Sequence, residues 1–459
     1  MEQSVNDGVS AAGDILINEL TIISYDGHEI DLQPFLVELN LIEEIFSTCL
    51  YGNIMISDAR GLIEKLPLIG EEYIRIDIKT PGTDFNITKT FRVYHISDRI
   101  MVNTDKSQSF TLHFCSPELF ADALNKIHKT FEGRIDNVAE TIYKNYLMTA
   151  RNIKVDKDSN KFIESEDSTD MTILSESQNN VKFTSPGWGP IKCLSWLAAK
   201  AIPKDKKIAD CLFFETCKNF YWGSISSIFD EYKTRKEVVA EYIYSPTNVN
   251  IRKPGEAVSV DGVQYKVPDV QRDYKILQDF TILDSFNTLR DTQTGFYASQ
   301  LITIDLLNKK FEYNDFDYIE SYKDGSHLNK FAPFSKTQFR TPLSHVTVGF
   351  VHPNLYTGFA DNVNEMIAKT KQARLSYIQG LSSMVVSGTV PGRTDMECGS
   401  VVAFSFPSLQ PKSIEDSTGI LDPQLSGLYL LTCIRHKITS LKHNMIIEMV
   451  KDSDQQQKD

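Results

Sequence analysis

Two stretches of this sequence, one near its beginning and one near its end, carry the same succession of β patterns. In order, they read Gly70-EEYIRIDI, Val93-YHISDRI and Ser109-FTLHFC, then Gly399-SVVAFSF, Leu431-TCIRHKI and Asn444-MIIEMV. In both, a glycine precedes a strand, a second strand ends in a basic residue and Ile (Arg99-Ile100 and Lys437-Ile438), and a hairpin partner returns. Two unrelated antiparallel hairpins could share this pattern. A true repeat predicts two barrel-like units, and such a chain can imitate twice its number of subunits in a closed ring.

The regions around these stretches have the alternation of strands. Three Ile residues between Ile74 and Ile78 alternate with other side chains, and this period of two indicates strands with one buried face. We interpret residues 14–116 as a first β domain, interrupted by a short helix from Asp58 to Leu66. Residues 361–450 are expected to hold a long helix, from about Asp361 to Leu381, and then the remaining strands of a second β domain.

Helical signals begin directly after the first β region. Ser116-Pro117-Glu118 combines an N-cap residue, a proline at the first helical position and an acid in the first turn. Further helices are predicted after Asp136 and from about Pro190 to Ile202, followed by a β-hairpin between Leu212 and Trp222. These elements indicate an α/β connector domain at residues 117–230.

The remaining segments have weaker patterns. Residues 231–270 are interpreted as an extended segment or insertion. Residues 271–318 are interpreted as the first part of the second β domain. Residues 319–360 are interpreted as a further insertion, because Gly, Pro and Ser weaken the periodicity there. The polar ends, residues 1–13 and 451–459, are expected to be disordered.

The composition excludes several classes of protein. Of 459 residues, 41% are hydrophobic and 10% aromatic, which rules out wholesale disorder. Lys and Arg number 48 against 61 Asp and Glu, a formal net charge of −13, so specific nucleic-acid binding through a basic surface is not expected. The sequence has neither a signal-peptide pattern at its start nor an apolar run of about 20 residues, so no membrane span is predicted. The seven scattered cysteines favour synthesis in a reducing compartment.

The sequence offers no convincing metal motif. Cys433 and His436 have ligand-like spacing, but on a strand residues three apart point to opposite faces. We interpret them as packed strand residues rather than zinc ligands. The acidic segment Asp156–Asp167 places oxygen ligands like a calcium loop, yet Lys161 stands where that loop needs glycine. A solvated loop is therefore favoured over a calcium site.

Catalytic motifs are equally weak. The sequence contains no C-x-x-C, H-E-x-x-H, G-x-S-x-G, P-loop or G-x-G-x-x-G. His28 lies near Asp26 and Asp31, but no nucleophile can be tied to it. The acid pairs Glu43-Glu44 and Glu71-Glu72 could suggest a glycosidase, but neighbouring carboxylates on a strand face opposite ways, so we expect solvated faces.

The tryptophans also have a structural interpretation. Trp188, Trp196 and Trp222 are expected in the core of the connector domain, with a carbohydrate platform as the alternative. No catalytic, cofactor-binding or metal-binding residue is predicted, and the chain is not expected to be an enzyme.

The order of several motifs resembles a known family. Leu50-Tyr51-Gly52, Ile54 to Glu64 and Leu68 to Ile74 are similar to the first barrel of the baseplate hub protein of contractile-tail bacteriophages. In that family a "YG" precedes a strand, and an Asp-containing turn and a short helix lead into a "G(D/N)E" strand. The match continues from Phe91 to Cys115. The family is related to the hub part of type VI secretion spike proteins.

The later half resembles the same family. Residues 294–318 are similar to the opening strands of the second barrel, and the helix ending near Leu381 leads into Val385 to Gly392, which contains the family's "PG" turn. The resemblance covers most of residues 14–230 and 270–450.

The resemblance implies an α+β fold of two tube-like antiparallel β-barrel domains plus α/β connector domains. It implies a homotrimer, a ring with pseudo-sixfold symmetry that adapts the sixfold tail tube to a threefold central spike and forms a channel for DNA. The expected partners are other copies of the chain, the spike, tail tube or tube-initiator proteins, the tape measure protein and inner baseplate wedge proteins. The expected location is the virion baseplate, after synthesis in the host cytoplasm. The aromatic hairpin is expected to help hold the spike, and an acidic channel would repel DNA phosphates.

Three alternatives to this function remain. The chain could be the hub of a related contractile injection system, although spike proteins there often carry a C-terminal β-helix that this sequence lacks. It could be a tail-associated peptidoglycan hydrolase, which no local motif supports. It could also be a peripheral baseplate or receptor-binding protein, which the double β pattern disfavours.

Overall fold

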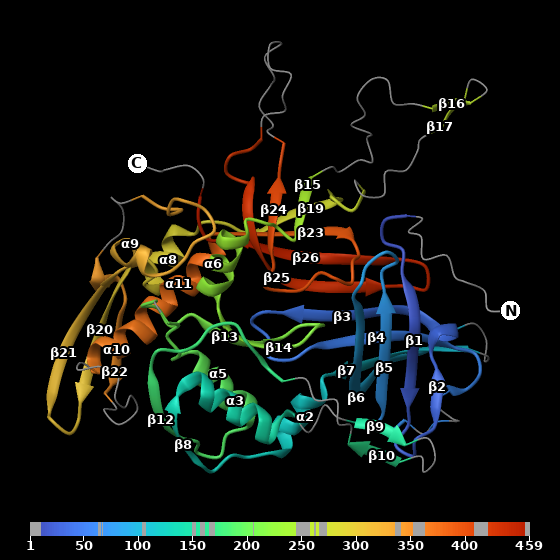
Figure 1. Ribbon diagram of the computed structural model, residues 1–459, viewed down its shortest axis with the longest axis horizontal. Coiled ribbons are helices and arrows are strands. Elements are labelled where there is room, and N and C mark those ends of the chain that lie inside the picture. Colours follow the sequence, from blue (N-terminus) through green and yellow to red (C-terminus); the bar gives the residue numbers. More distant parts are fainter. Residues whose placement is uncertain are drawn as a thin grey trace.

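A large sheet of fourteen strands organises the molecule (Figure 1). The first β region lies at the right of Figure 1, the second β region at the upper centre, a helical connector below them, and a smaller α/β unit at the left. No helix in the described part is long and apolar enough to span a membrane. The computed structural model describes residues 11–62, 66, 68–102, 107–148, 153–156, 161–164, 170–204, 206–244, 258–260, 263–265, 273–335, 341–351, 363–407 and 421–454.

Seven strands form the first β region. They are β1 (Leu16–Ile23), β2 (Glu29–Asp31), β3 (Leu36–Glu44), β4 (Tyr51–Asp58), β5 (Tyr73–Lys79), β6 (Asn86–Val102) and β7 (Ser107–Cys115). The 3-10 turn η1 (Gln33–Phe35) separates β2 from β3. The order in the sheet is β2-β1-β5-β6-β7-β4-β3, and every pair is antiparallel. The alternating Ile74, Ile76 and Ile78 are all buried in one core, as their period of two predicts.

Seven further strands form the second β region. They are β15 (Ala240–Tyr244), β18 (Ile276–Leu277), β19 (Asp279–Asp284), β23 (Met384–Pro391), β24 (Val401–Ser405), β25 (Gly427–Ile438) and β26 (His443–Lys451). Their order is β18-β15-β24-β25-β26-β23-β19. The strand β15 is parallel to both of its neighbours, and the other pairs are antiparallel.

The two regions have the same strand order when their strands are matched along the chain. The strands β1 to β7 then correspond to β15, β18, β19, β23, β24, β25 and β26, and only the direction of the first strand differs. Even a register shift recurs, between Val93 and His95 on β6 and between Leu431 and Cys433 on β25. This topology supports the internal repeat inferred from the sequence.

The strand β25 joins the two regions into one continuous sheet. Its first residues pair with β24, whereas Cys433–Ile438 pair with Leu39–Glu44 of β3. The mostly β fold with added helices agrees with the expected class. No closed barrel is detected among the described residues, so the two expected barrels are observed as two halves of a shared sheet.

Two glycines of the family-like motifs allow close approach of neighbouring strands. A Cβ added to Gly52 on β4 would lie 2.2 Å from the carbonyl oxygen of Asn40 on β3. One added to Gly388 on β23 would lie 2.5 Å from the carbonyl oxygen of Asp279 on β19. The glycines stand on equivalent strands, so the same steric requirement recurs in both regions.

The connector packs its helices and small sheets around a core of its own. Its helices confirm the three that were predicted, although the third ends at Ala198, and α6 was not foreseen. The Ser224 side chain caps α6 by accepting a hydrogen bond from Ser227 N. The elements are α2 (Pro117–Leu124), β8 (Thr130–Arg134), α3 (Ile135–Tyr146), β9 (Ile153–Asp156), β10 (Lys161–Glu164), β11 (Thr172–Ile173), β12 (Asn180–Thr184), α5 (Pro190–Ala198), β13 (Cys211–Glu215), β14 (Phe220–Ser224) and α6 (Ile225–Arg235).

A separate unit lies between β19 and β23 in the chain. Its sheet has the order β21-β20-β22 and does not join the large sheet. Residues 298–317 were expected to open the second β domain, but β19 takes that position instead. Residues 319–360 were expected to be an insertion, yet they supply β22. The elements are α8 (Thr288–Thr294), β20 (Ala298–Asp305), β21 (Lys310–Asp317), α9 (Tyr318–Ser321), η2 (Tyr322–Asp324), η3 (Pro342–Ser344), β22 (Val346–Phe350), α10 (Val363–Ala368), the π-helical η4 (Lys369–Ala373), α11 (Arg374–Gly380) and η5 (Leu381–Ser383).

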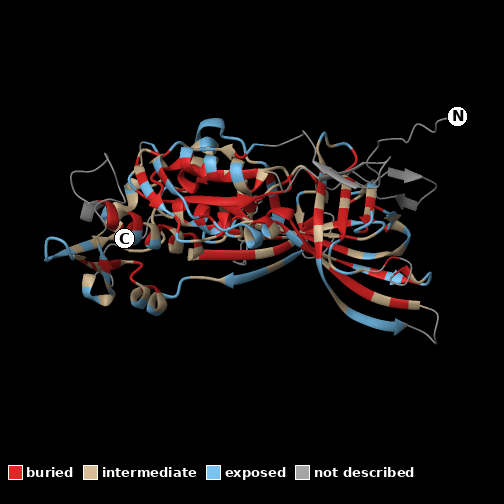
Figure 2. Ribbon diagram, turned by 90° about the horizontal axis from the view of Figure 1, so that it is seen from below, coloured by how far each residue is buried: buried red, intermediate tan, exposed pale blue. Residues whose placement is uncertain are grey.

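Other expectations change at the chain ends and in the middle. Disorder from residue 451 is wrong for Lys451, Asp452 and Ser453, which are buried (Figure 2 shows the buried interior in red). Gly13, expected in a disordered end, accepts a hydrogen bond of 2.8 Å from His443 N. The segment 231–270 contains the end of α6, the sheet strand β15, and the small pair β16 (Val258–Val260) and β17 (Val263–Tyr265). Of the predicted helix Asp58–Leu66, residues 63–65 lie outside the described residues, and Asp58 is the last residue of β4.

Candidate functional site at the junction of the two β regions

The turn of the β13–β14 hairpin lies where the connector meets both β regions. The backbone of Thr216 donates a hydrogen bond of 2.9 Å to the carbonyl of Asn219, which closes the turn. Glu215 and Cys217 are buried at 2% exposure each. The hairpin's aromatic residues Phe213, Phe220 and Trp222 are buried in the connector core, so these three rings are not available to hold a spike.

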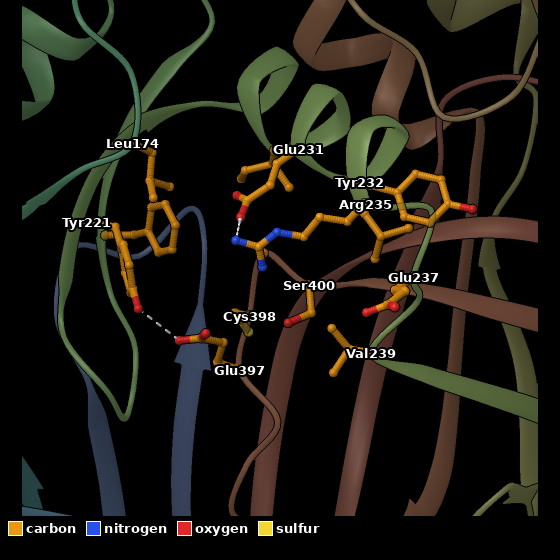
Figure 3. A pocket seen from close by; sticks show the side chains of 14 residues that line it. Leu174, Tyr221, Glu231, Tyr232, Arg235, Glu237, Val239, Glu397, Cys398 and Ser400 are labelled. Atoms are coloured by element: carbon orange, nitrogen blue, oxygen red, sulfur yellow. Dashed lines mark hydrogen bonds and ion pairs between the residues drawn. The ribbon is translucent and has the colours of Figure 1, made fainter. Parts of the chain in front are cut away.

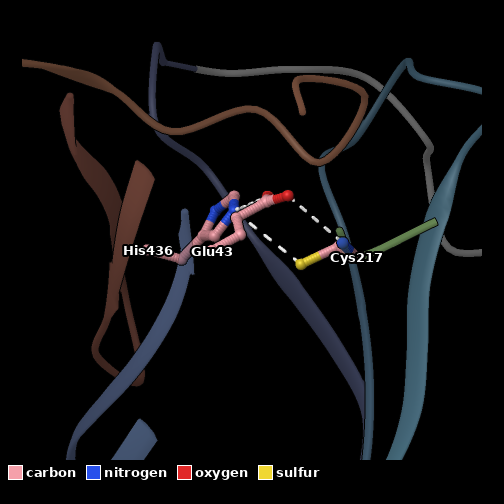
Figure 4. A group of neighbouring side chains, drawn as sticks. All are labelled: Glu43, Cys217 and His436. Carbon is pink, nitrogen blue, oxygen red and sulfur yellow. Dashed lines mark hydrogen bonds and ion pairs between the residues drawn. The ribbon is translucent and has the colours of Figure 1, made fainter. Parts of the chain in front are cut away.

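Three buried side chains meet at the junction of β3, β25 and the hairpin turn (Figure 4). Glu43 Oε1 lies 2.9 Å from His436 Nε2, and Glu43 Oε2 accepts a hydrogen bond of 3.2 Å from Cys217 N. Cys217 Sγ lies 4.0 Å from His436 Nε2. Glu43 comes from the first repeat and His436 from the second, so their contact ties the repeats together beside the hairpin.

Two more residues extend this buried network. His436 Nδ1 lies 3.0 Å from His443 Nε2, and the Cys398 thiol donates to the carbonyl oxygen of Glu43 at 3.2 Å. Burial, together with His436, holds the pKa of His443 well below its usual value. Burial, and then Glu43, raises the pKa of the Cys217 thiol well above its usual value. The network therefore favours a neutral His443 and a protonated thiol at Cys217.

Among the described residues, the same three side chains are the candidate ligands for a metal ion. One ligand atom each from Glu43, Cys217 and His436 lies within 4.8 Å of the others. Carboxylate, thiolate and imidazole are ligands that zinc accepts. However, both carboxylate oxygens of Glu43 are already engaged, Oε1 with His436 Nε2 and Oε2 with Cys217 N. A structural hydrogen-bond network fits these groups better than a metal centre.

A buried ion pair fixes the hairpin to the first β region. Lys89 Nζ on β6 lies 3.2 Å from Glu215 Oε1, and both side chains are nearly inaccessible. Glu215 Oε2 also accepts hydrogen bonds from Leu50 N at 2.9 Å and Ser116 Oγ at 2.5 Å. Ser116 stands at the N-cap position of α2 as predicted, but no cap hydrogen bond from its side chain is found there.

Side chains that line a groove beside the hairpin attach the hairpin to the second β region (Figure 3). Glu397 accepts hydrogen bonds from Tyr221 Oη at 3.1 Å and from Lys218 Nζ at 2.8 Å. Across the groove, Arg235 forms an ion pair of 2.7 Å with Glu231 on α6. Burial raises the pKa of the Cys398 thiol well above its usual value. These contacts attach the hairpin to the second β region, and the Cys398 thiol in the groove is not activated.

The structure separates Cys433 and His436, which were interpreted as packed strand residues rather than zinc ligands. His436 belongs to the buried network, and Cys433 is not part of the cluster found around it in the described residues. Sequence spacing was therefore misleading, as the strand argument had indicated. The acid pairs do face opposite ways, but the expectation of solvated faces is wrong for Glu43 and Glu72, which are both 0% exposed. Glu72 accepts hydrogen bonds from the backbone of Ile69 and Gly70.

The other sequence candidates remain apart from the junction. His28 Nε2 lies 3.5 Å from Asp26 Oδ2 in an exposed turn. The acidic segment 156–167 lies partly outside the described residues. The strand β9 stands where a helix precedes a calcium loop of that type, and β10 lies within the segment and pairs with β9.

The tryptophans behave as core residues. Trp222 is fully buried, and Trp188 and Trp196 pack against the same connector core, as predicted. Lys192 and Lys200 lie over the Trp188 and Trp196 rings at 4.8 and 4.4 Å from their centroids. These lysines occupy faces that a carbohydrate platform would need.

Sequence reasoning missed the residues that form the junction. Glu43 and His436 are 393 residues apart, and Cys217 and His436 are 219 apart. No local motif links positions so distant. The repeat was the one available signal, because it indicated that the two β regions belong to one architecture.

Solved structures show which proteins share this architecture. A tail protein from Neisseria meningitidis has a TM-score of 0.52 at 10% identity, over 95% of this chain and 96% of its own. This chain has the fold of a phage tail protein. A second tail protein with this fold, the 43 kDa protein of prophage MuSo2 from Shewanella oneidensis, has a TM-score of 0.50 at 10% identity, over 95% of this chain and 98% of its own. No protein-family model and no curated protein matches the sequence.

Proposed function

We propose that this chain is a structural virion protein, the central baseplate hub of a contractile phage tail. The observation that carries the proposal is the strand order, which recurs strand for strand in the two β regions. In each region a bent segment, β2–β3 or β18–β19, pairs with the first strand at its beginning and with the fourth strand at its end. This arrangement supports two tube-like units per chain.

The mechanism follows from counting these units. Three copies of a chain with two equivalent units present six units around a ring, although the true symmetry is threefold. Such a ring would accept the sixfold tail tube on one side and a threefold central spike on the other, with a channel for DNA along its axis. The partners would be the spike, tail tube or tube-initiator proteins, the tape measure protein and inner wedge proteins of the baseplate.

Two other functions are weaker. A hub of a related contractile injection system would use the same architecture, and the identity of the bound spike would distinguish it. A peptidoglycan hydrolase would need an activated group. Every cysteine has its pKa raised by burial, and Glu231 and Glu397, which line the groove, are each paired with a cation. A cell-wall lysis assay would test this alternative directly.

The native mass of the purified protein at micromolar concentration tests the proposal. We expect about 156 kDa, three times the chain mass of 52.1 kDa, alone or after addition of the spike encoded beside it. A stable dimer, or a monomer that stays monomeric with the spike, would overturn the hub proposal.

A further inference from the structure

The two equivalent strands β6 and β25 have different surroundings along one edge. The first half of β25 pairs with β24 and its second half with β3. The first half of β6, Asn86–Arg92, pairs with β5 in the same way. For residues 94–102, however, no strand pairs with the edge away from β7 in the described part of the chain. The position that β3 fills beside β25 is thus open beside β6.

The equivalent strands β3 and β19 differ in the complementary way. β3 pairs with β4 on one edge and with β25 on the other. β19 pairs with β23, the equivalent of β4, and no strand lies on its other edge among the described residues. One chain therefore carries one filled junction, β25 with β3, and the two unfilled halves of a second junction.

Exposure of apolar side chains marks the same two edges. Ile438 on β25 is 0% exposed, whereas Ile100, its match in the sequence repeat on β6, is 62% exposed. Met101 beside it is 66% exposed, and Ile282 and Leu283 on β19 are 44% and 53% exposed. Exposed apolar edge strands are a liability that folded proteins normally cover or pair. These side chains fit a partner strand better than solvent.

The charges at the edges are complementary as well. In the filled junction, Lys437 Nζ lies 3.0 Å from Glu38 Oε2. Arg99 on β6 matches Lys437 in the sequence repeat. In the pairing it lies one residue before the in-register equivalent, Ile100, because β6 has a register shift between Ser97 and Ile100 that β25 lacks. Asp279 on β19 corresponds to Glu38 on β3. Asp279 pairs with Thr389 on β23, Glu38 pairs with Met55 on β4, and these two partners hold equivalent positions on their strands. The open edges therefore carry a cation and an anion where the filled junction has an ion pair.

We propose that β6 of one copy pairs antiparallel with β19 of the next copy, and so repeats the junction that β25 and β3 make within the chain. Arg99 of one copy then pairs with Asp279 of the other, and Ile100 and Ile282 become buried. The pairing rests on the edges of this fold, and the closing of three copies into a ring rests on the proposed function.

Charge reversal tests the pairing. We expect Arg99→Asp and Asp279→Arg each to shift the native mass from trimer toward monomer. An equimolar mixture of the two variants should regain complexes, because an interface between one variant and the other again places opposite charges together. The control is Lys442→Asp, which reverses an exposed cation in the β25–β26 turn and should leave the mass unchanged. Trimers that persist in both single variants would overturn the proposed edge while leaving the hub proposal intact.

A disulfide trap gives an answer even if the isolated chains associate weakly. The filled junction pairs Lys437 with Asn40, and the in-register pair between copies is Ile100 and Thr281. We expect Ile100→Cys mixed with Thr281→Cys to form cross-linked dimers under mild oxidation, well above a mixture of Ile100→Cys with Leu307→Cys. Leu307 is 78% exposed and lies far from this edge in sequence. Equal yields in the two mixtures would overturn the pairing, whichever mass the native protein has.

Discussion

The two β regions share a strand order but differ in what surrounds it. In the first, residues 45–50 connect the third strand to the fourth, whereas residues 285–383 make the corresponding connection in the second and fold into a unit of their own. The order of the sheet is unchanged by this addition, because the added chain leaves and re-enters at strand ends. The regions differ more in their edges, since the filled edge is buried and the open ones are exposed. The comparison shows that two regions with the same strand order can differ in which of their edge strands are paired.

The largest expected effect comes from comparing the two ion pairs that hold the hairpin, one to each β region. Lys89→Met removes the buried cation beside Glu215 and should lower the free energy of unfolding by about 3–5 kcal/mol, since the buried carboxylate loses its counter-charge. Lys218→Met removes the partly exposed partner of Glu397 and should cost less than about 1 kcal/mol. Urea unfolding of both variants measures the difference. Equal losses would mean that the hairpin is held alike on both sides.

The equivalent isoleucines give the next comparison. Ile438→Ala creates a cavity in the core and should lower the free energy of unfolding by about 2–5 kcal/mol. Ile100→Ala should change the stability of the monomer by no more than about 0.5 kcal/mol, because its side chain is 62% exposed. Thermal unfolding of the two variants under conditions that keep the chain monomeric tests this. A large loss for Ile100→Ala would show that its edge is covered within the chain.

The junction network predicts a pH dependence that has no counterpart at the open edge. The pKa of His443 is lowered in the folded state, so the unfolded chain binds the extra proton. Stability should be complete above about pH 6.5 and should fall as the pH drops below it, by up to about 1.4 kcal/mol per pH unit. His436, Glu43, Cys217 and Cys398 are the other titratable groups of the network. His443→Gln should flatten the slope between pH 6.5 and 5, and an unchanged slope would assign the loss to other groups.

The smallest expected effect concerns the exposed ion pair of the filled junction. Lys437→Ala removes a pair whose side chains are 40% and 27% exposed. We expect a loss of roughly 0–1 kcal/mol, since partly exposed pairs contribute little. A double-mutant cycle with Glu38→Ala measures the coupling. A coupling well above that range would make charge, rather than burial, the main determinant of the junction.

Sequence reasoning found the repeat and most helices because both depend on local periodicity. It misplaced the strands after Gly295 because an alternating pattern indicates a strand without saying which sheet it joins. It expected Glu43 and Glu72 to be solvated because a carboxylate is normally exposed. The hydrogen bonds that make their burial acceptable come from Cys217 and His436 for Glu43, and from the Ile69–Gly70 backbone for Glu72. The partners of Glu43 lie 174 and 393 residues away and leave no mark on a single sequence, whereas those of Glu72 are local.

The long strand β25 also has a mechanical consequence. Its first half belongs to the sheet with β24 and its second half is bonded to β3, so a load applied to one region reaches the other along a single covalent backbone. The β25–β3 bonds lie across that load and share it in shear, rather than breaking one after another as in unzipping. The two halves of the chain would therefore tilt as one stiff lever under such a load.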